Sequence, residues 1–242
     1  MEHILVTQAQ RFGELRQHFD RHGQKSLKRL EGQTMIEQGT PEWFAQRLGK
    51  VTASRVADVI AKTKTGYSTS RDNYMAQLVC ERLTGTVAES FTNAAMAHGT
   101  ETEPLARAAY ESKADVLVDE VAMISHPTIE NAGASPDGLV GEDGLVEIKC
   151  PANTATHIDT LLTQTVPGKY ITQMQWQMAC TGRKWCDFVS FDNRLPEELQ
   201  IFIKRIERDD VYIKMLEEEV IKFLKELNDK IEKLNKLKEK NG

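Results

Sequence analysis

Residues 135 to 151 read SPDGLVGEDGLVEIKCP and place Asp137, Glu147 and Lys149 outside the turn of a segment that otherwise has the pattern of a buried β-hairpin. Two short apolar runs flank a turn at residues 141 to 143, which contains residue types common in tight turns. Successive side chains of a strand point to opposite faces, so Glu147 and Lys149 share one face while their apolar neighbours share the other. The pattern predicts a sheet with one charged face and one apolar face.

The length of the turn decides whether a second acid joins this face. A three-residue turn pairs Val140 with Gly144, and therefore Asp137 with Glu147, across the hairpin. A turn of two or four residues without a bulge would send the two acids to opposite faces. A glycine at position 144 suits the left-handed residue that closes a three-residue turn, so it favours the arrangement with adjacent acids.

Adjacent carboxylates repel each other unless a cation lies between them. Asp137 and Glu147 offer oxygen ligands with no histidine or cysteine nearby, which favours Mg²⁺ or Mn²⁺ over zinc. We expect Lys149 to lie too far along the strand for its role to be the neutralisation of one acid. It would instead orient or deprotonate a water molecule, or neutralise charge that develops on a phosphoryl group. Such a set suits phosphodiester hydrolysis.

The same three residues also fit a solvated strand face with a weak ion pair. Alternating charges on a strand usually have that simple explanation, and the spacing of Asp, Glu and Lys is degenerate. On this pattern alone the solvated face is the more frequent outcome. The rest of the chain therefore has to decide between the two interpretations.

Helices and strands follow one another in an order typical of an α/β or α+β fold with a mixed central sheet flanked by helices. Thr40 before Pro41 predicts a helix start, and Thr52 or Ser54 is expected to cap a second helix. The other expected helices span residues 70–85, 93–114 and 168–182, and the expected strands lie within residues 115–125, 132–140, 144–150, 185–192 and 199–207.

Three regions are expected along the chain. Residues 1–38 form a helical arm, residues 39–208 a catalytic domain, and residues 209–242 one long helix. The last region has apolar side chains three or four positions apart, at Ile213, Leu216, Val220, Phe223, Leu227, Ile231 and Leu234. This stripe would pack on the domain, although a coiled coil or a partner-binding surface also fits it.

Composition limits the classes of function. The formal net charge of −5 does not suit a protein that coats nucleic acid, so a polyanionic substrate would have to be bound at a local site. The 4 cysteines lack the spacing of zinc or iron–sulfur motifs and are expected to be reduced. The chain shows no apolar run long enough for a membrane helix and begins with no signal-like segment, so we expect a cytoplasmic protein.

Four blocks of sequence together resemble the phage lambda-type exonucleases, also called YqaJ-type viral recombinase nucleases, of the PD-(D/E)XK superfamily. They read EQGTPEWFAQRLGKVTAS, HGTETEPLARAAYE, SPDGLV with GLVEIKCP, and YITQMQWQM, and they follow the family order from residue 37 to residue 178. The resemblance implies the restriction-endonuclease-like core of that superfamily. It shifts the interpretation of the hairpin from a solvated face to a catalytic site.

The resemblance also implies roles for individual residues. Asp137, Glu147 and Lys149 would be catalytic, and the metal would be held by the two acids with Glu103 and the backbone carbonyl of Ile148. The residues implied or considered as contacts to DNA phosphates are Arg47, Ser54, Gln173, Tyr170 and Lys64. A surface role for Glu103, a core role for Tyr170 and a helix-end role for Arg47 remain possible from the residues alone.

By resemblance, the protein would hydrolyse linear double-stranded DNA from 5′-phosphorylated ends with Mg²⁺, and Mn²⁺ would substitute. It would act as a ring-shaped homotrimer beside a single-strand annealing protein, in the cytoplasm of a bacterial host that carries the phage or prophage. Two alternatives remain: a structure-selective or restriction-like endonuclease of the same superfamily, and a non-catalytic protein that organises a recombination complex.

Overall fold

The computed structural model describes residue 36, residues 38–87 and residues 94–241. The helical arm expected for residues 1–38 lies almost wholly outside the described residues, so the three-region division of the chain stays a prediction. No helix in the described part of the chain is both long enough and apolar enough to cross a membrane.

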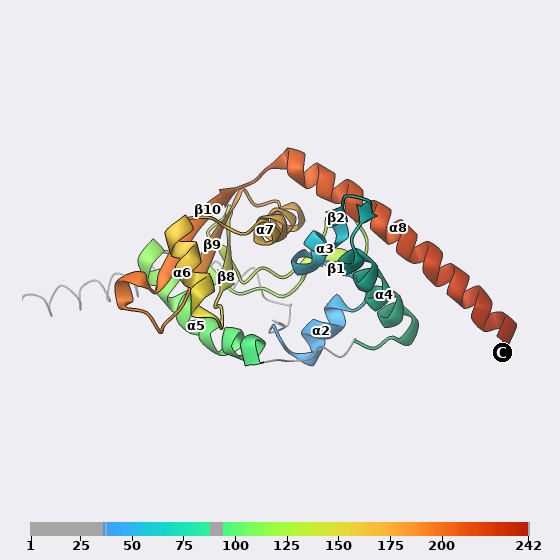
Figure 1. The fold of residues 1–242 in the computed structure, drawn as a ribbon, viewed down its shortest axis with the longest axis horizontal. Coiled ribbons are helices and arrows are strands. Elements are labelled where there is room, and N and C mark those ends of the chain that lie inside the picture. The colour runs from blue at the N-terminus through green and yellow to red at the C-terminus, as the bar shows by residue number, and fades with distance from the viewer. Residues whose placement is uncertain (1–35, 37, 88–93, 242) are drawn as a thin grey trace, which may run out of the picture. The chain divides into compact units, whose positions relative to one another are not determined.

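The central sheet has five strands in the order β10-β9-β8-β7-β4 (Figure 1). The strands β8 and β9 run parallel, and the other neighbours are antiparallel, so the expected mixed sheet is confirmed. The strands are β4 (Val118–Asp119), β7 (Gly138–Val140), β8 (Gly144–Lys149), β9 (Trp185–Phe191) and β10 (Ile201–Glu207).

A smaller three-stranded sheet has the order β1-β6-β5, and a two-stranded hairpin joins β2 to β3. The strand β1 pairs with β6 in parallel, so the chain near residue 51 lies beside the segment that leads into β7. These strands are β1 (Val51–Thr52), β2 (Lys62–Thr63), β3 (Gly66–Tyr67), β5 (Ile124–Ser125) and β6 (Ala132–Ala134).

Helices cover both faces of the central sheet. The described helices are α2 (Pro41–Arg47), α3 (Val56–Ile60), α4 (Thr69–Thr84), α5 (Ala94–Ala114), α6 (Thr154–Thr163), α7 (Gly168–Thr181) and α8 (Asp210–Asn241), with short 3₁₀ turns η1 (Ala53–Arg55) and η2 (Glu197–Leu199). Leu145 of β8 packs with Met174 and Met178 of α7 on one face. Val146 packs with Tyr110 of α5 on the other. Both faces of β8 are therefore covered by a helix, and the prediction of one charged and one apolar face was wrong, because Leu145 is a core residue on the face of Glu147.

The β7–β8 hairpin has the predicted register. Val140 pairs with Gly144 across a three-residue turn, which places Asp137 opposite Glu147 just beyond the last paired residues. The expectation for Gly144 was wrong, because the left-handed residue of the turn is Gly141, with φ of +55°. Gly144 is required for a different reason: a Cβ there would lie 2.1 Å from the ring of Trp185.

Two predicted helix caps have different outcomes. The hydroxyl of Thr40 accepts a hydrogen bond from the amide of Trp43 at 3.3 Å, so the start of α2 is confirmed. Neither Thr52 nor Ser54 caps α3 with its side chain, and that prediction was wrong. Thr52 is the last residue of β1 and pairs with β6, and the 3₁₀ turn that contains Ser54 separates it from α3.

The long helix α8 packs against α3, α4 and α7 (Figure 1). Its buried apolar side chains are Ile213, Leu216, Val220, Phe223, Leu224 and Leu227. Ile231 is partly buried against the same core, whereas Leu234 and Leu237 are exposed, so the stripe belongs to the core as far as Ile231.

We predict that Leu216→Ala lowers the free energy of unfolding by about 2–5 kcal/mol, because it leaves a cavity at a fully buried position. Leu237→Ala removes the same group from a side chain that is 55% exposed and should change stability by less than about 0.5 kcal/mol. Urea denaturation followed by circular dichroism measures both. Equal effects of the two substitutions would contradict the described packing of α8.

Candidate active site

The carboxylate of Glu147 is the centre of the charged cluster. Glu147 is fully buried in β8, where the helix α7 covers it. Gln173 of α7 donates to Oε1 at 2.6 Å, and Gln177, one turn later, donates to Oε2 at 2.5 Å. A buried carboxylate requires such partners, because burial removes the water that would otherwise solvate its charge.

Lys149 lies on the same face of β8 and forms an ion pair with Oε1 of Glu147. The expectation that Lys149 lies too far along the strand to neutralise an acid was therefore wrong, because its long side chain reaches back two residues. Burial would lower the pKa of Lys149, but the carboxylates of Glu147 and Asp137 outweigh burial and raise it above its ordinary value. The ammonium group also lies 5.3 Å from the ring centroid of Tyr170, which brings that predicted residue into the cluster.

Asp137 lies immediately before β7 and joins the cluster through the hairpin register. Its Oδ2 accepts a hydrogen bond from the backbone amide of Ile148 at 2.7 Å. Burial, and then the charge of Glu147, raise the pKa of Asp137 well above its ordinary value, although Lys149 acts in the opposite direction. The two acids are therefore close enough to repel, as the turn length predicted.

Glu103 approaches the cluster from α5. Burial raises the pKa of Glu103, and the charges of Arg107, Lys149 and Glu147 also act on it. Arg107 donates to Glu103 Oε1 at 2.8 Å from one turn along the helix and also pairs with Glu120. Arg107 was not among the predicted site residues, although its spacing of four from Glu103 is a recognisable helix pair.

Gln177 was also missed, because only Gln173 was expected in the site. The two residues share a helix face, and both donate to Glu147. A third glutamine, Gln175, binds the backbone instead: it donates to the carbonyl of Glu207 at 2.7 Å and accepts from the amide of Asp209 at 2.9 Å. The sequence alone could not divide these roles, since they depend on which side of α7 meets β8.

Arg47 lies at the end of α2 and is joined to the segment that precedes Asp137. Its guanidinium donates to the hydroxyl of Ser135 at 3.2 Å and lies 4.1 Å from the ring centroid of Trp43. Trp43 donates to the same hydroxyl at 3.2 Å. Burial lowers the pKa of Arg47, yet an arginine remains charged. None of the ion pairs in the described part of the chain includes Arg47, so its charge is available to an anion.

The two remaining predicted DNA contacts lie outside this hydrogen-bonded cluster. Ser54 is exposed in η1, which packs on α7 and β6. Lys64 is exposed at the turn of the β2–β3 hairpin, and that hairpin is joined to α8 by the pairing of Lys62 with Glu219 at 2.7 Å.

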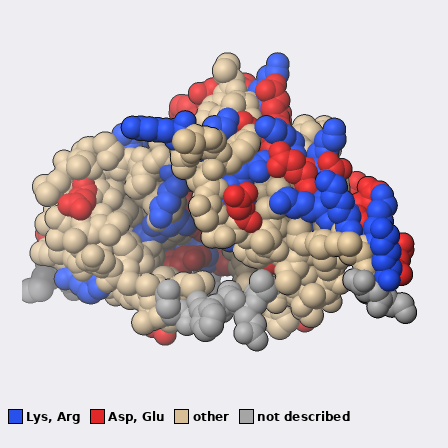
Figure 2. Space-filling view, turned by 45° about the vertical axis from the view of Figure 1, so that its right-hand side comes forward, with Lys and Arg blue, Asp and Glu red and all other residues tan. Residues whose placement is uncertain are grey.

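Figure 2 shows a hollow on one face of the molecule in which acidic and basic side chains lie together.

The donor chemistry of the cluster fits a hard divalent cation. Among the described residues, no group of three or more carboxylate, histidine or cysteine side chains is arranged to hold a metal. This does not conflict with Mg²⁺, which proteins commonly bind through one or two carboxylates together with water and substrate phosphates. Asp137 and Glu147 supply such a pair.

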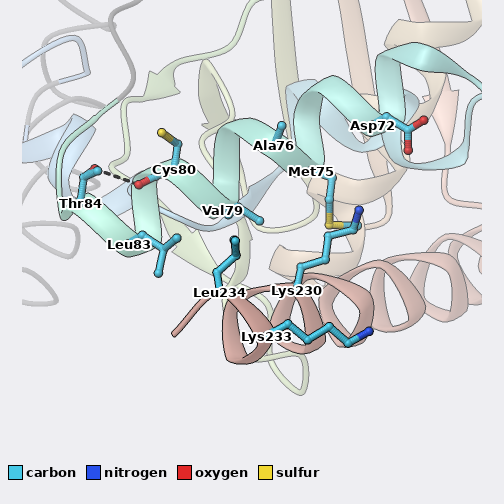
Figure 3. Close-up of a pocket in the computed structure, with 10 residues that line it drawn as sticks. All are labelled: Asp72, Met75, Ala76, Val79, Cys80, Leu83, Thr84, Lys230, Lys233 and Leu234. Carbon is cyan, nitrogen blue, oxygen red and sulfur yellow. Dashed lines mark hydrogen bonds between the residues drawn. The ribbon is translucent and has the colours of Figure 1, made fainter. Parts of the chain in front are cut away.

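A separate apolar groove lies between α4 and α8 and has a volume of about 540 Å³ (Figure 3). Met75, Val79 and Leu83 of α4 face Leu234 of α8 there. None of the predicted site residues lines this groove, so the chemistry of the hairpin lies elsewhere in the molecule.

The segment that follows β8 is held by an ion pair in the segment that follows β9. Asp192 directly follows β9 and accepts from Arg194 at 2.7 and 2.8 Å. The same guanidinium donates to the carbonyls of Pro151 and Ala152 at 2.9 and 2.8 Å, just after Lys149. Burial would raise the pKa of Asp192, but the hydrogen bonds from Arg194 outweigh it and lower the pKa to about 2.

Comparison with known proteins identifies the same family as the four sequence blocks. A family model described as the YqaJ-like viral recombinase domain matches residues 42–184. The crystal structure of an alkaline exonuclease (LHK-Exo) from Laribacter hongkongensis is 58% identical, with a TM-score of 0.79, and the match covers 84% of this chain and 100% of that one. The structure of LHK-Exo in complex with dAMP is 59% identical, with the same TM-score of 0.79 and the same coverage of 84% and 100%.

A phage-related exonuclease from Haemophilus somnus 129PT has the same fold at 18% identity, with a TM-score of 0.64 and coverage of 76% of this chain and 96% of that one. No curated protein sequence matches this chain.

We predict that Asp192→Asn lowers the free energy of unfolding by about 2 kcal/mol near neutral pH. In the unfolded chain an Asp has a pKa of about 4, so the lowered pKa in the folded protein stabilises it above that pH. This contribution is lost as the pH falls from about 4 to about 2. Urea denaturation of both proteins across this range measures the difference between them. A difference that does not change with pH would contradict the assignment.

Proposed function

Because the chain belongs to the YqaJ-like viral recombinase family and is a DNA exonuclease, we propose that it digests linear duplex DNA from 5′-phosphorylated ends with Mg²⁺ and leaves a 3′ single strand. The observation that supports this proposal most directly is the cluster of Asp137, Glu147 and Lys149 on one hairpin. The similarity to LHK-Exo, an alkaline exonuclease, supports the same chemistry.

In this proposal Asp137 and Glu147 hold the cation, with the carbonyl of Ile148 and with Glu103 as further ligands. When bound, Mg²⁺ would supply positive charge to the phosphoryl oxygens and make a bound water more acidic, and Mn²⁺ would substitute. Glu103 would have to exchange its contact with Arg107 for this role. The raised pKa of Asp137 supports a cation site, because a bound cation would remove the repulsion between the acids.

Lys149 would act on the attacking water or on the charge that develops at the phosphorus. Its ammonium group is held beside Glu147, with the ring of Tyr170 on another side. This arrangement orients the group without fully burying it, since 28% of the side chain is exposed. A partly exposed ammonium can reach a substrate while its position stays defined.

Arg47 would bind the terminal phosphate. Ser135 and the Trp43 ring orient its guanidinium, which has no carboxylate partner among the described residues. Gln173 would contribute to phosphate binding only by giving up its bond to Glu147. Ser54 and Lys64 are exposed and would contact DNA away from the buried acids.

The proposed biological setting is phage-type recombination in the cytoplasm of a bacterial host. A single-strand annealing protein would bind the strand that the enzyme leaves, and a homotrimeric ring would enclose the duplex. A ring would reconcile the net charge of −5 with a DNA substrate, because only the surface that meets the duplex would need to be basic.

We predict that Lys149→Ala lowers the rate of digestion of linear 5′-phosphorylated duplex by about 100-fold or more, because it removes the group that acts on the water or the phosphoryl charge. Lys184→Ala is the matched control. Lys184 pairs with Asp143 in the turn of the same hairpin at 3.0 Å, and its side chain is 70% exposed. Gel assays with and without Mg²⁺ measure the rates, and thermal denaturation verifies folding.

The same assay includes covalently closed and nicked circles to separate the exonuclease from the endonuclease alternative. The proposal expects both circles to remain intact. Cutting of the closed circle would favour an endonuclease of the same superfamily. Intact linear DNA in the presence of both Mg²⁺ and Mn²⁺ would overturn the proposed function.

We also predict that Arg47→Ala reduces the preference for a 5′-phosphate over a 5′-hydroxyl end by about tenfold, since it removes a charged hydrogen bond to the phosphate. Arg55→Ala is the control, because Arg55 stacks on Tyr74 at 4.2 Å but is paired with Asp58 at 2.7 Å. The ratio of initial rates on the two kinds of end is the readout. An equal loss of rate on both ends would assign Arg47 a structural role instead.

A further inference from the structure

The two oxygens of the Glu147 carboxylate have unequal surroundings. Oε1 accepts from Lys149 and from Gln173, whose side chains are both partly exposed. Oε2 accepts from Gln177, which is fully buried in α7. Oε1 therefore lies toward the open side of the cluster, while Oε2 is turned into the interface between β8 and α7.

The position of the Gln177 amide is itself constrained. Its Nε2 donates to Glu147 at 2.5 Å, and its Oε1 lies 3.9 Å from the thiol of Cys186 on β9. Met174 and Met178 of the same helix pack in the core beside it. If Glu147 withdrew Oε2, the amide of Gln177 would remain buried without this acceptor, which is unfavourable.

We propose that Gln177 is a positioning residue that leaves Glu147 one oxygen, Oε1, for a cation and thereby sets the preference of the site for Mg²⁺ over Ca²⁺. The inference rests on the proposed function, because it assumes that Glu147 is a ligand. Lys149 and Gln173 can move away from Oε1 without leaving a fully buried group, whereas Gln177 would leave Oε2 only at the cost of a buried amide without its acceptor.

Ion chemistry connects this geometry with selectivity. Mg²⁺ requires a nearly octahedral shell of single oxygen ligands and keeps several waters. Ca²⁺ accepts more ligands and commonly binds both oxygens of one carboxylate. A Glu147 whose Oε2 is held in the interface between β8 and α7 by the buried Gln177 therefore suits Mg²⁺ and offers Ca²⁺ only one oxygen.

The test measures the binding of Mg²⁺, Mn²⁺ and Ca²⁺ to the full chain by isothermal titration calorimetry, without DNA. Gln177→Met keeps the volume of the side chain but removes the donor, and Gln177→Asn keeps an amide that is too short to reach Oε2. Both variants should shift the ratio of the Mg²⁺ and Ca²⁺ dissociation constants toward Ca²⁺, by about tenfold for Gln177→Met, because Oε2 becomes available to the ion.

Gln175→Met is the matched control from the same helix. Gln175 is also buried, but its amide contacts the backbone of Glu207 and Asp209. Its loss should lower the melting temperature and leave the ratio of dissociation constants at the wild-type value. This separates the positioning of Glu147 from a general loosening of α7.

Two results would count against the inference in different ways. If wild type binds Mg²⁺ and the folded Gln177 variants keep its Mg²⁺ to Ca²⁺ ratio, the role of Gln177 is overturned while the proposed function stands. If wild type binds neither Mg²⁺ nor Mn²⁺, the metal site of the proposed function fails and the inference fails with it.

Discussion

The interaction on which the site depends is the burial of the Glu147 carboxylate between β8 and α7. A buried charge is costly unless each oxygen is hydrogen-bonded and an opposite charge lies near. Here Lys149 supplies the charge, and Gln173 and Gln177 supply the donors. The same bonds join the sheet to the helix, so the packing of α7 and the chemistry of the hairpin depend on each other.

Two further links connect the site to the rest of the molecule. Arg194 joins Asp192 at the end of β9 to the two carbonyls that follow the hairpin, which restrains the chain just after Lys149. On the other side of Asp137, Ser135 accepts from Trp43 and Arg47 of α2. Acidic and basic groups that lie far apart in the sequence are therefore held by contacts to one short segment, residues 135–152.

Local rules predicted some features well. The three-residue turn determined the register of β7 against β8 and hence the pairing of Asp137 with Glu147, because strand pairing leaves little choice once the turn length is known. The same reasoning failed for Gly144, whose requirement comes from Trp185 on a neighbouring strand. It failed also for Thr52 and Ser54, since a strand and a 3₁₀ turn occupy the place of the expected cap.

The sequence by itself determined the strands of the central sheet, most helices but not α6, the apolar stripe of α8 and the hairpin that brings two acids and a lysine together. These features follow from side-chain periodicity and turn length, which act over a few residues. Only the tertiary structure decided that Glu147 is fully buried, that Gln177 holds its second oxygen while Gln175 binds backbone, and that Arg47 meets Ser135. Each of these depends on which surfaces of distant segments come into contact, and no local pattern specifies that choice.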